Sequence, residues 1–340
     1  MKHPAMLWEK SEDGRVGCFL CAHRCRIGPG QFGFCGVRQH LDGKLYSLVY
    51  AEPIAAHLDP IEKKPLYHFL PGSRAYSVAT VGCNFHCAFC QNWQISQLNK
   101  KDPRADGVPS VSPEEIVEQA QFYKAHSIAY TYTEPTIFFE YAYDTARLAH
   151  AQNLANIFVT NGFMSREALE QIQPFLDAAN VDLKSFDDQF YRKHCSARLE
   201  PVLETIRCMK ELGIWLEITT LIIPGLNDSE QELEEITRFI AGIDPAIPWH
   251  ISRFHPDYQF NGYSATPIST LQKARHIGQQ QGLKFIYIGN VAERSDTVCP
   301  QCQQLLISRP MLGRPSIHFE NNACPKCHTP IAGVWKTKRE

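Results

Sequence analysis

Three cysteines with C-x3-C-x2-C spacing, Cys83, Cys87 and Cys90, carry the most specific chemistry in this sequence. Thiolates are soft ligands, and closely spaced cysteines with no apolar signal core before them favour iron–sulfur or zinc binding over disulfides. A cubane iron–sulfur cluster takes four cysteines, so a run of three leaves one iron with an open position. An open position is typical of catalytic metal sites. The alternative is a structural zinc site that borrows a fourth ligand such as His86.

Eleven of the 13 cysteines fall in three such clusters, and only Cys195 and Cys208 stand apart. The first cluster lies in a glycine-rich loop and consists of Cys18, Cys21, Cys25 and Cys35. Thiolate suits both metals, so zinc and an auxiliary iron–sulfur cluster both remain open there. The third cluster contains two C-P-x-C knuckles, formed by Cys299, Cys302, Cys324 and Cys327. This pattern predicts a structural zinc ribbon, with a rubredoxin-like iron as the alternative.

The bulk composition narrows the class of protein. The chain has 340 residues, enough for one large α/β domain with small additions. Its formal net charge is −2, so no strongly basic field indicates nucleic-acid binding. No apolar run approaches the roughly 20 residues of a membrane span. We therefore expect a cytoplasmic protein that does not enter a membrane and is an unlikely binder of nucleic acid.

Strand-like and helix-like segments alternate from residue 75 onwards. The expected strands are 75–80, 127–133, 155–160, 179–184, 214–223 and 248–254. The expected helices are 112–125, 137–151, 165–173, 201–212, 229–241 and 268–281. Such alternation predicts a parallel sheet with right-handed crossovers, and six units are fewer than the eight of a closed barrel. The predicted fold is thus α/β, a partial (β/α)6 barrel, with 285–288 as a further strand.

This pattern divides the chain into three parts. Residues 1–70 form a cysteine-rich N-terminal segment, 71–291 the (β/α)6 core, and 292–340 a C-terminal segment resembling a zinc ribbon. In a βα-barrel the C-terminal ends of the strands face the active site. Polar residues follow five strands in succession, which indicates a lined pocket at that edge.

The central cysteine run, with aromatic Phe89 between its last two cysteines, resembles the signature of the radical S-adenosylmethionine (SAM) superfamily. The resemblance implies a [4Fe–4S] cluster whose open iron is chelated by SAM. It also implies that one electron cleaves SAM to methionine and a 5′-deoxyadenosyl radical, which abstracts hydrogen from a substrate.

SAM would need several partners at the strand ends. Glu134 is expected to accept from its ammonium, Lys184 to pair with its carboxylate, and Thr160 and Asn161 to bind the ribose. An apolar stretch containing Ile222 would carry the adenine. The predicted cofactor contacts are Phe89, Thr133, Glu134, Thr160, Asn161, Asp182, Lys184, Ile222 and His255. His255 would meet either SAM or substrate, and Asp182 and Lys184 have the alternative of pairing with each other.

A narrower resemblance rests on Asn161-Gly162, Asp182-Leu183-Lys184 and Phe254-His255, which are similar to strand ends of pyruvate formate-lyase activating enzymes. Tyr132-Thr133-Glu134 stands where that subgroup has Gly-Gly-Glu. Together with both outer cysteine clusters, the layout is similar to the radical SAM enzymes of the AmmeMemoRadiSam system. That resemblance implies a protein substrate or Memo-type and AMMECR-type partners, and an electron donor of the flavodoxin or ferredoxin type.

Two other functions stay open at this point. One is a zinc-binding adaptor in which all three cysteine clusters are structural. The other is a radical enzyme that modifies RNA held by the C-terminal knuckles, against which the near-neutral charge counts.

Overall fold

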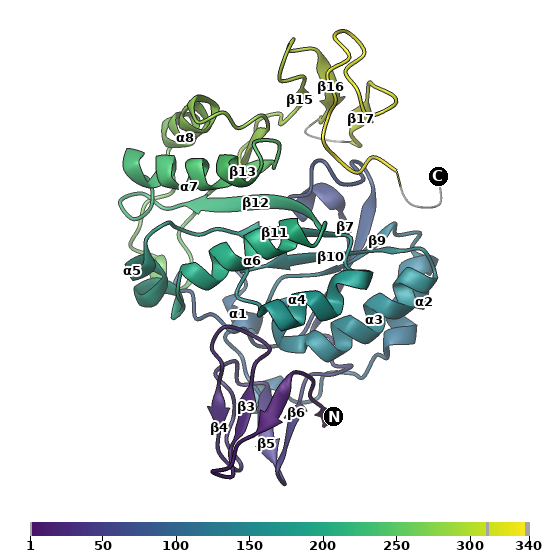
Figure 1. Ribbon diagram of the computed structural model, residues 1–340, viewed down its shortest axis with the longest axis vertical. Helices are drawn as coiled ribbons and strands as arrows, with labels where there is room; N and C mark the ends of the chain where they lie inside the picture. The colour runs from purple at the N-terminus through teal and green to yellow at the C-terminus, as the bar shows by residue number, and fades with distance from the viewer. Residues whose placement is uncertain (1, 311–312, 337–340) are drawn as a thin grey trace.

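An eight-stranded sheet whose strand order follows the chain forms the centre of the structure, a computed structural model that describes residues 2–310 and 313–336 (Figure 1). Its strands are β7 (Ala55–Pro60), β8 (Arg74–Ala79), β9 (Ser127–Tyr130), β10 (Ala155–Thr160), β11 (Ala178–Asp182), β12 (Trp215–Ile222), β13 (Trp249–Arg253) and β14 (Ile286–Gly289). The strands from β8 to β14 pair in parallel, each with the next. The expected partial barrel is confirmed, and the further strand at 285–288 corresponds to β14.

Helices connect the parallel strands as expected. The main ones are α2 (Pro113–Phe122), α3 (Phe139–Ala151), α4 (Arg166–Ile172), α6 (Glu200–Glu211), α7 (Glu230–Ile243) and α8 (Ile268–Gln280). Ser112 caps α2 in a complete capping box with Glu115. Ser229 caps α7, but the side chain of Glu232 accepts from Ser185 Oγ and Phe186 N instead of closing a second box. Glu232 thereby anchors the loop that follows β11.

One strand of the sheet was not expected. β7 pairs antiparallel with β8, from Ala55 opposite Ala79 to Pro60 opposite Arg74. We had expected the first strand only at residue 75, and Pro53, Pro60 and Pro65 argue against a helix in the stretch before it. β7 is an edge strand with one side unpaired, and edge strands tolerate proline because no ladder bond is lost on that side.

The segment after β7 fills the N-terminal end of the barrel. Ile61, Leu66 and Phe69 pack in one buried cluster with small side chains of the barrel strands, such as Ala75 and Ala129. Small residues there leave room for the larger side chains of the segment. This filling leaves the C-terminal end of the strands as the end where a ligand can bind.

Small antiparallel sheets flank the barrel on two sides (Figure 1). At the N-terminus these are β1 (His3–Pro4), β6 (Lys44–Ser47) and β5 (Arg38–Leu41), and β2 (Trp8–Lys10), β3 (Val16–Cys18) and β4 (Arg26–Ile27). At the C-terminus they are β15 (Thr297–Val298), β16 (Leu305–Ser308) and β17 (Ser316–Ile317). Residues 311–312 and 337–340 of the predicted C-terminal segment lie outside the described residues. Among the described helices, none is long and apolar enough to cross a membrane.

Glu217 on β12 holds the segment after β7 against the barrel. Its buried carboxylate accepts from the backbone N–H groups of Tyr67 and His68 at 2.9 and 2.8 Å, and it pairs with His250 Nε2 at 2.7 Å. Burial acts to raise the pKa of Glu217, but the bonds to His250 and the two backbone groups hold that pKa below its ordinary value. Deprotonated Glu217 therefore fastens the segment that fills the barrel.

Replacing Glu217 tests this role. Glu217→Gln leaves a buried N–H without an acceptor, and we expect it to lower the free energy of unfolding by about 3 kcal/mol at pH 7. Because the folded-state pKa is depressed, the stabilisation is present above the ordinary carboxyl pKa and is lost as pH falls through the folded value. Wild type should lose more stability than Glu217→Gln on acidification, measured by urea unfolding. Glu230→Gln, at an exposed position on α7, is the control; equal effects of both variants would contradict the role.

Candidate active site

The central cysteine loop follows directly after β8, at the C-terminal edge of the barrel. Backbone bonds fix it, since His86 N–H donates to Cys195 O and Ala88 N–H to His194 O, both at 2.9 Å. Gly82 precedes the first cysteine with a φ of +96°, and a Cβ there would lie 2.7 Å from Val37 Cγ1. Only glycine fits this close approach and this backbone conformation.

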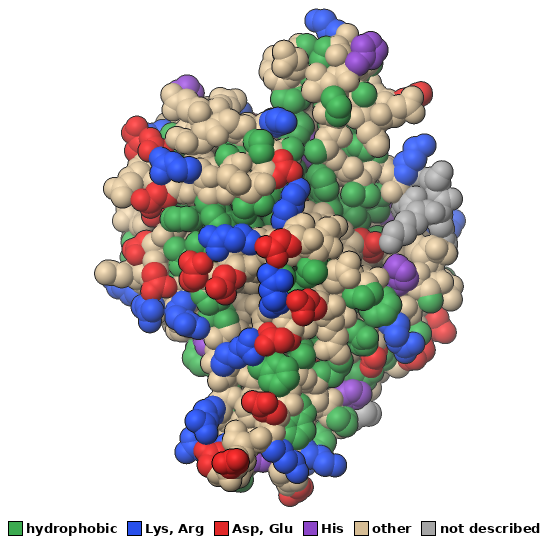
Figure 2. Space-filling model, in the orientation of Figure 1, with side chains coloured by type: hydrophobic (Ala, Val, Ile, Leu, Met, Phe, Trp, Pro, Cys, Tyr) green, Lys and Arg blue, Asp and Glu red, His purple; other side chains and the backbone are tan. Residues whose placement is uncertain are grey.

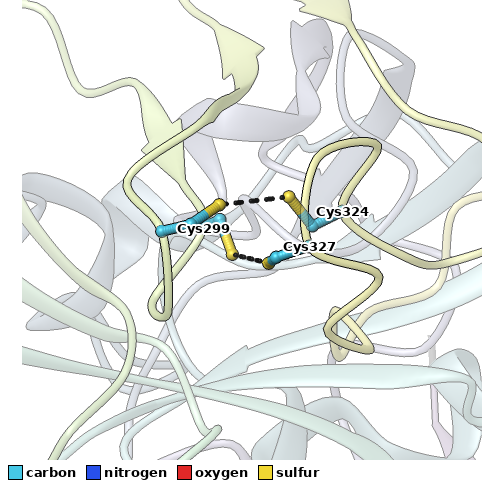
Figure 3. Close-up of side chains that lie close together, drawn as sticks. Cys299, Cys324 and Cys327 are labelled. Atoms are coloured by element: carbon cyan, nitrogen blue, oxygen red, sulfur yellow. Dashed lines mark hydrogen bonds between the residues drawn. The ribbon is translucent and has the colours of Figure 1, made fainter.

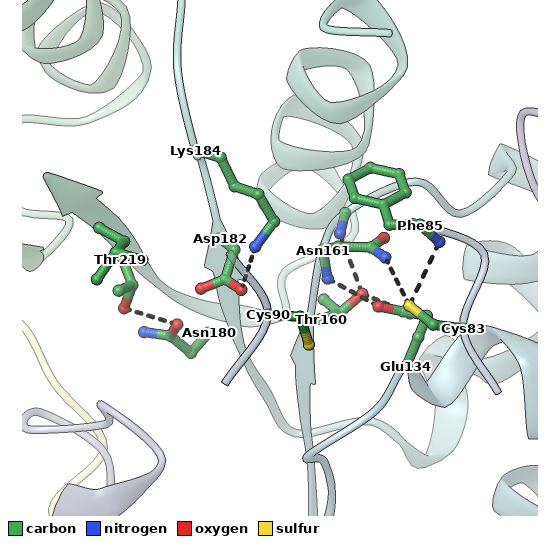
Figure 4. Close-up of polar contacts among 12 residues, drawn as sticks. Cys83, Phe85, Cys90, Glu134, Thr160, Asn161, Asn180, Asp182, Lys184 and Thr219 are labelled. Carbon is green, nitrogen blue, oxygen red and sulfur yellow. Dashed lines mark hydrogen bonds and ion pairs between the residues drawn. The ribbon is translucent and has the colours of Figure 1, made fainter. Parts of the chain in front are cut away.

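Two of the three sulfurs have polar partners in the surrounding fold, and Figure 4 shows those of Cys83. Cys83 Sγ accepts from Phe85 N–H at 3.3 Å and from Asn161 Nδ2 at 3.8 Å. Cys90 Sγ lies 3.1 Å from the Ser96 hydroxyl. Burial raises the pKa of both thiols, so the thiolate forms need a cation beside them. A metal centre bound to deprotonated sulfur supplies that charge.

The three sulfurs of this loop do not form the compact group that a single metal ion requires. A tetrahedral zinc with Zn–S bonds of about 2.3 Å brings its sulfurs to about 3.8 Å from one another. Among the described residues, no three ligand atoms of the central loop come within 4.8 Å of one another. His86, the fourth ligand of the zinc alternative, stacks instead on Phe34 at 4.6 Å between ring centroids. Three thiols on one loop suit a [4Fe–4S] cluster with one iron left open.

Cys195 joins this site, although we had set it apart from the clusters. It ends the π-helix η5 (Tyr191–Cys195) after β11 and is fully buried. Its thiol acts on the Cys87 sulfur and comes first among the causes that lower the pKa of Cys87. No local spacing marks Cys195, because the tertiary fold alone brings η5 against the cysteine loop.

Glu134 has a fully buried carboxylate that is already occupied. Its Oε1 accepts from Thr136 N–H at 3.0 Å, from Thr136 Oγ1 at 2.5 Å and from Thr160 Oγ1 at 2.8 Å, and its Oε2 accepts from Asn161 N–H at 2.8 Å. Glu134 thus caps the short helix η3 (Pro135–Phe138) and joins the ends of β9 and β10. These four donors assign it a positioning role, and its expected contact with the SAM ammonium stays a prediction.

Asn161 and Thr160 lie at the end of β10 and serve the cysteine loop (Figure 4). Asn161 Nδ2 donates to Asn84 Oδ1 at 2.7 Å, and Asn161 Oδ1 accepts from Phe163 N–H at 3.1 Å. The Thr160 hydroxyl donates to Glu134 and accepts from Gly162 N–H. Both side chains are buried, so they link β10 to the loop, and the predicted ribose contacts stay untested.

Asp182 and Lys184 at the end of β11 pair with each other at 2.8 Å, as the alternative interpretation expected. Burial acts to lower the pKa of Lys184, but Asp182 and the sulfurs of Cys87 and Cys195 raise it well above its ordinary value. Lys184 therefore stays protonated and brings one positive charge to the cysteine loop. Its Nζ also lies 5.9 Å from the centroid of the Phe89 ring.

The remaining predicted contacts divide into rim and interior positions. His255 lies at the exposed rim, where its Nε2 is 2.9 Å from Gln91 Nε2. Thr133 donates from Oγ1 to Thr80 O at 3.0 Å. Ile222 is fully buried and shares the helix-facing side of β12 with Thr220, which accepts from Trp249 Nε1. The expected adenine contact of Ile222 stays a prediction, although alternation along the strand turns its side chain away from the barrel interior.

Polar side chains also line the barrel interior, and we had not predicted them. Thr219 donates to Asn180 Oδ1 at 2.8 Å (Figure 4). Asp59 Oδ2 accepts from Lys64 Nζ and from Ser77 Oγ, both at 2.8 Å. Burial lowers the pKa of Lys64 to about 8, although Asp59 acts against this shift. The interior of the barrel is thus polar and charged, and Lys64 comes from the stretch that follows the unexpected strand β7.

The four C-terminal cysteines converge on one point (Figure 3). Cys299 Sγ lies 3.5 Å from Cys327 Sγ, and Cys302 Sγ lies 3.6 Å from Cys324 Sγ. All four sulfurs are within 4.8 Å of one another. This is close to the sulfur–sulfur distance of about 3.8 Å expected around a tetrahedral ion. The predicted knuckles therefore form a site of the size of a single metal ion. The N-terminal Cys18, Cys21, Cys25 and Cys35 line one small cavity instead.

Comparisons with known proteins agree with this geometry. Residues 77–240 match the family model described as the radical SAM superfamily. An uncharacterized protein of Methanocaldococcus jannaschii is 43% identical over 330 residues, which cover 95% of this chain and 97% of that protein. The chain belongs to the radical SAM superfamily. It is therefore an enzyme of that superfamily, which works with a [4Fe–4S] cluster and SAM.

Two further similarities concern the relatives of this radical SAM enzyme and its fold. The pyruvate formate-lyase-activating enzyme of Clostridium pasteurianum is 20% identical, over 63% of this chain and 91% of that enzyme. The crystal structure of Streptococcus suis SuiB aligns with a TM-score of 0.50 at 12% identity, over 68% of this chain and 52% of that chain. The first shows relatedness to activating enzymes, and the second concerns the fold alone.

Gly82 offers a test of how the site is positioned. Gly82→Ala should displace the loop from Val37 and reduce cluster occupancy, because both a left-handed backbone and a close contact are lost. Such backbone strain costs about 1–2 kcal/mol, and forced packing adds about 1–3 kcal/mol. Gly14→Ala, with a φ of +75° and open space around the Cβ, carries the backbone cost alone. Iron content after anaerobic reconstitution should fall only in Gly82→Ala; equal iron in both variants would count against the assigned role.

Proposed function

We propose that Cys83, Cys87 and Cys90 hold the [4Fe–4S] cluster of this enzyme and that the enzyme cleaves SAM reductively to abstract hydrogen from a protein. The observation that carries the proposal is the set of three cysteines on the loop after β8, whose sulfurs do not form the compact set of a single ion and of which two have polar partners. When bound, the cluster and SAM supply one electron and a 5′-deoxyadenosyl radical.

The chain's own residues provide charge and position. Lys184 is a protonated, largely buried cation at the end of β11, and it suits a carboxylate such as that of the methionine part of SAM. Asp182 is more exposed than Lys184 and can accept from an ammonium or a hydroxyl. Leu221, which precedes buried Ile222 and faces the interior of the barrel, is the apolar surface we now propose for the adenine.

A protein is the substrate class we propose. The support is the relatedness to a pyruvate formate-lyase-activating enzyme. The ends of β10, β11 and β13 also carry the residues that resemble strand ends of such activating enzymes. Installation of a glycyl radical and modification of a Memo-type or AMMECR-type partner are the two forms of this activity. An electron donor of the flavodoxin or ferredoxin type supplies the reductant.

The two other functions that the sequence left open have less support. An adaptor with only structural zinc does not agree with membership of an enzyme superfamily. For RNA, the view in Figure 2 shows Lys and Arg side chains next to Asp and Glu side chains across one face, without a basic stripe. Exposed pairs such as Arg166–Glu211 and Lys210–Asp244 belong to this mixture of charges. Sequence-independent RNA binding needs clustered positive charge.

The activity is tested by anaerobic reconstitution with iron, sulfide and a one-electron reductant. We expect methionine and 5′-deoxyadenosine from SAM, and complete loss of both in Cys87→Ala, because two thiolates do not hold the cluster. Cys208→Ala, a buried cysteine on α6 outside all clusters, is the matched control and should keep the reaction. Turnover by Cys87→Ala would refute the proposal. Deuterium transfer from a labelled candidate protein into 5′-deoxyadenosine then tests the substrate class.

We also propose that the C-terminal cysteines hold structural zinc. Their compact tetrahedral spacing supports a single ion, and folding of such ribbons is coupled to metal binding. Cys324→Ser should lose one zinc per chain and expose the segment around β16 to protease, while the barrel stays folded. Iron in place of zinc in protein purified without added metal would contradict the assignment.

A further inference from the structure

The N-terminal cysteine loop encloses a cavity that the activity described so far does not use. Its walls combine four sulfurs with apolar side chains and one guanidinium. The lining residues are Cys18, Leu20, Cys21, Cys25, Ile27, Gly33, Phe34, Cys35, Arg38, Thr136 and Ile137. Leu20 and Ile27 are buried, so the cavity is shielded from water on that side. Four thiols around one shielded cavity form a complete ligand set for a metal centre.

The spacing of the four sulfurs separates the two metals that the sequence left open. Within residues 2–310, which include this loop, no three of these sulfurs lie within 4.8 Å of one another. In the same structure the C-terminal sulfurs are all within that distance. Like the central cysteines, the N-terminal set therefore does not form the compact group that a single ion requires. Zinc alone would draw the sulfurs to about 3.8 Å from one another.

Arg38 gives a second, independent indication. Its guanidinium is 1% exposed, and Nη1 donates to Cys18 Sγ at 3.1 Å. Nη2 pairs with buried Glu140, but Nε has no partner among the described residues. A buried N–H without an acceptor is costly, and bridging sulfides of an iron–sulfur cluster accept such bonds. The positive charge also offsets that of four thiolates, while Phe34 N–H donates to Cys25 Sγ at 3.5 Å.

The two cysteine loops lie against each other. A Cβ on Gly82 would lie 3.2 Å from Cys35 O, so the backbone after β8 touches the N-terminal loop. His23 Nε2 is 2.7 Å from Asn84 O, and Phe34 stacks on His86. The side chain of Phe34 is 39% exposed, which brings this contact to the surface. A centre in the N-terminal loop is therefore placed between solvent and the central loop.

We propose that Cys18, Cys21, Cys25 and Cys35 hold a second cubane iron–sulfur cluster, which passes single electrons to the cluster at the central loop. Four protein ligands leave no open iron, so this cluster transfers electrons rather than binding substrate. A flavodoxin or ferredoxin gives up one electron and reduces the N-terminal cluster. That cluster is oxidised again when it reduces the central one, and no bond or proton changes place. The electron-transfer role rests on the proposed function, whereas the metal assignment stands alone.

Metal counting on the full chain tests the assignment. Two cubanes predict about eight irons per chain, and Cys21→Ser should lose about four of them with the zinc content unchanged. Cys208→Ser should keep all eight, since it makes the same exchange at a buried cysteine outside the clusters. A second zinc per chain, displaced by Cys21→Ser, would overturn the proposal. In a Cys83→Ser variant, about four irons with the absorbance of a cubane should remain, which separates this test from failure of the central site.

The choice of reductant tests the role in electron transfer. With a flavodoxin-type donor, Cys21→Ser should cleave SAM more slowly than wild type by a larger factor than with dithionite. A small reductant reaches the central cluster directly, whereas a protein donor docks at the surface near Phe34. Equal slowing with both reductants would overturn the role. Electron paramagnetic resonance of the reduced wild type should show two interacting clusters, and one isolated cluster would contradict the proposal.

Discussion

The site depends on how the negative charge of buried cysteine thiolates is balanced at the C-terminal edge of the barrel. Burial raises the pKa of the Cys83 and Cys90 thiols, so a thiolate there is unfavourable without positive charge close by. Phe85 N–H, the Ser96 hydroxyl and the protonated Lys184 each act on this charge. A bound metal cluster completes the compensation, which links the folding of the loop to its chemistry.

The rest of the chain keeps this edge in place. Glu134 joins β9 and β10 through four hydrogen bonds, and Asn161 carries the connection on to the cysteine loop. At the opposite end, the segment after β7 fills the barrel and Glu217 fastens it. Arg309 donates to Tyr67 O at 2.7 Å, which binds the C-terminal ribbon to the same segment. A closed N-terminal end leaves ligand binding to the C-terminal edge.

Local patterns in the sequence predicted much of this architecture. The βα alternation and the three cysteine clusters depend on short spacings, which the sequence shows directly. β7 was missed because prolines on an edge strand look like breaks. Cys195 was missed because only the tertiary fold brings η5 to Cys87. Two further features could have been predicted from local sequence: Pro135 after Glu134 is a helix-start signal, and strand alternation from Thr219 turns Leu221, not Ile222, inward.

The central claim concerns one iron that lacks a protein sulfur. The most direct measurement is an anaerobic crystal structure with SAM, recorded with anomalous scattering at the iron edge. We expect four irons at the loop after β8, with Cys83, Cys87 and Cys90 each bound to one and SAM on the fourth. A single tetrahedral ion there, or a fourth iron bound by Cys195, would contradict the assignment.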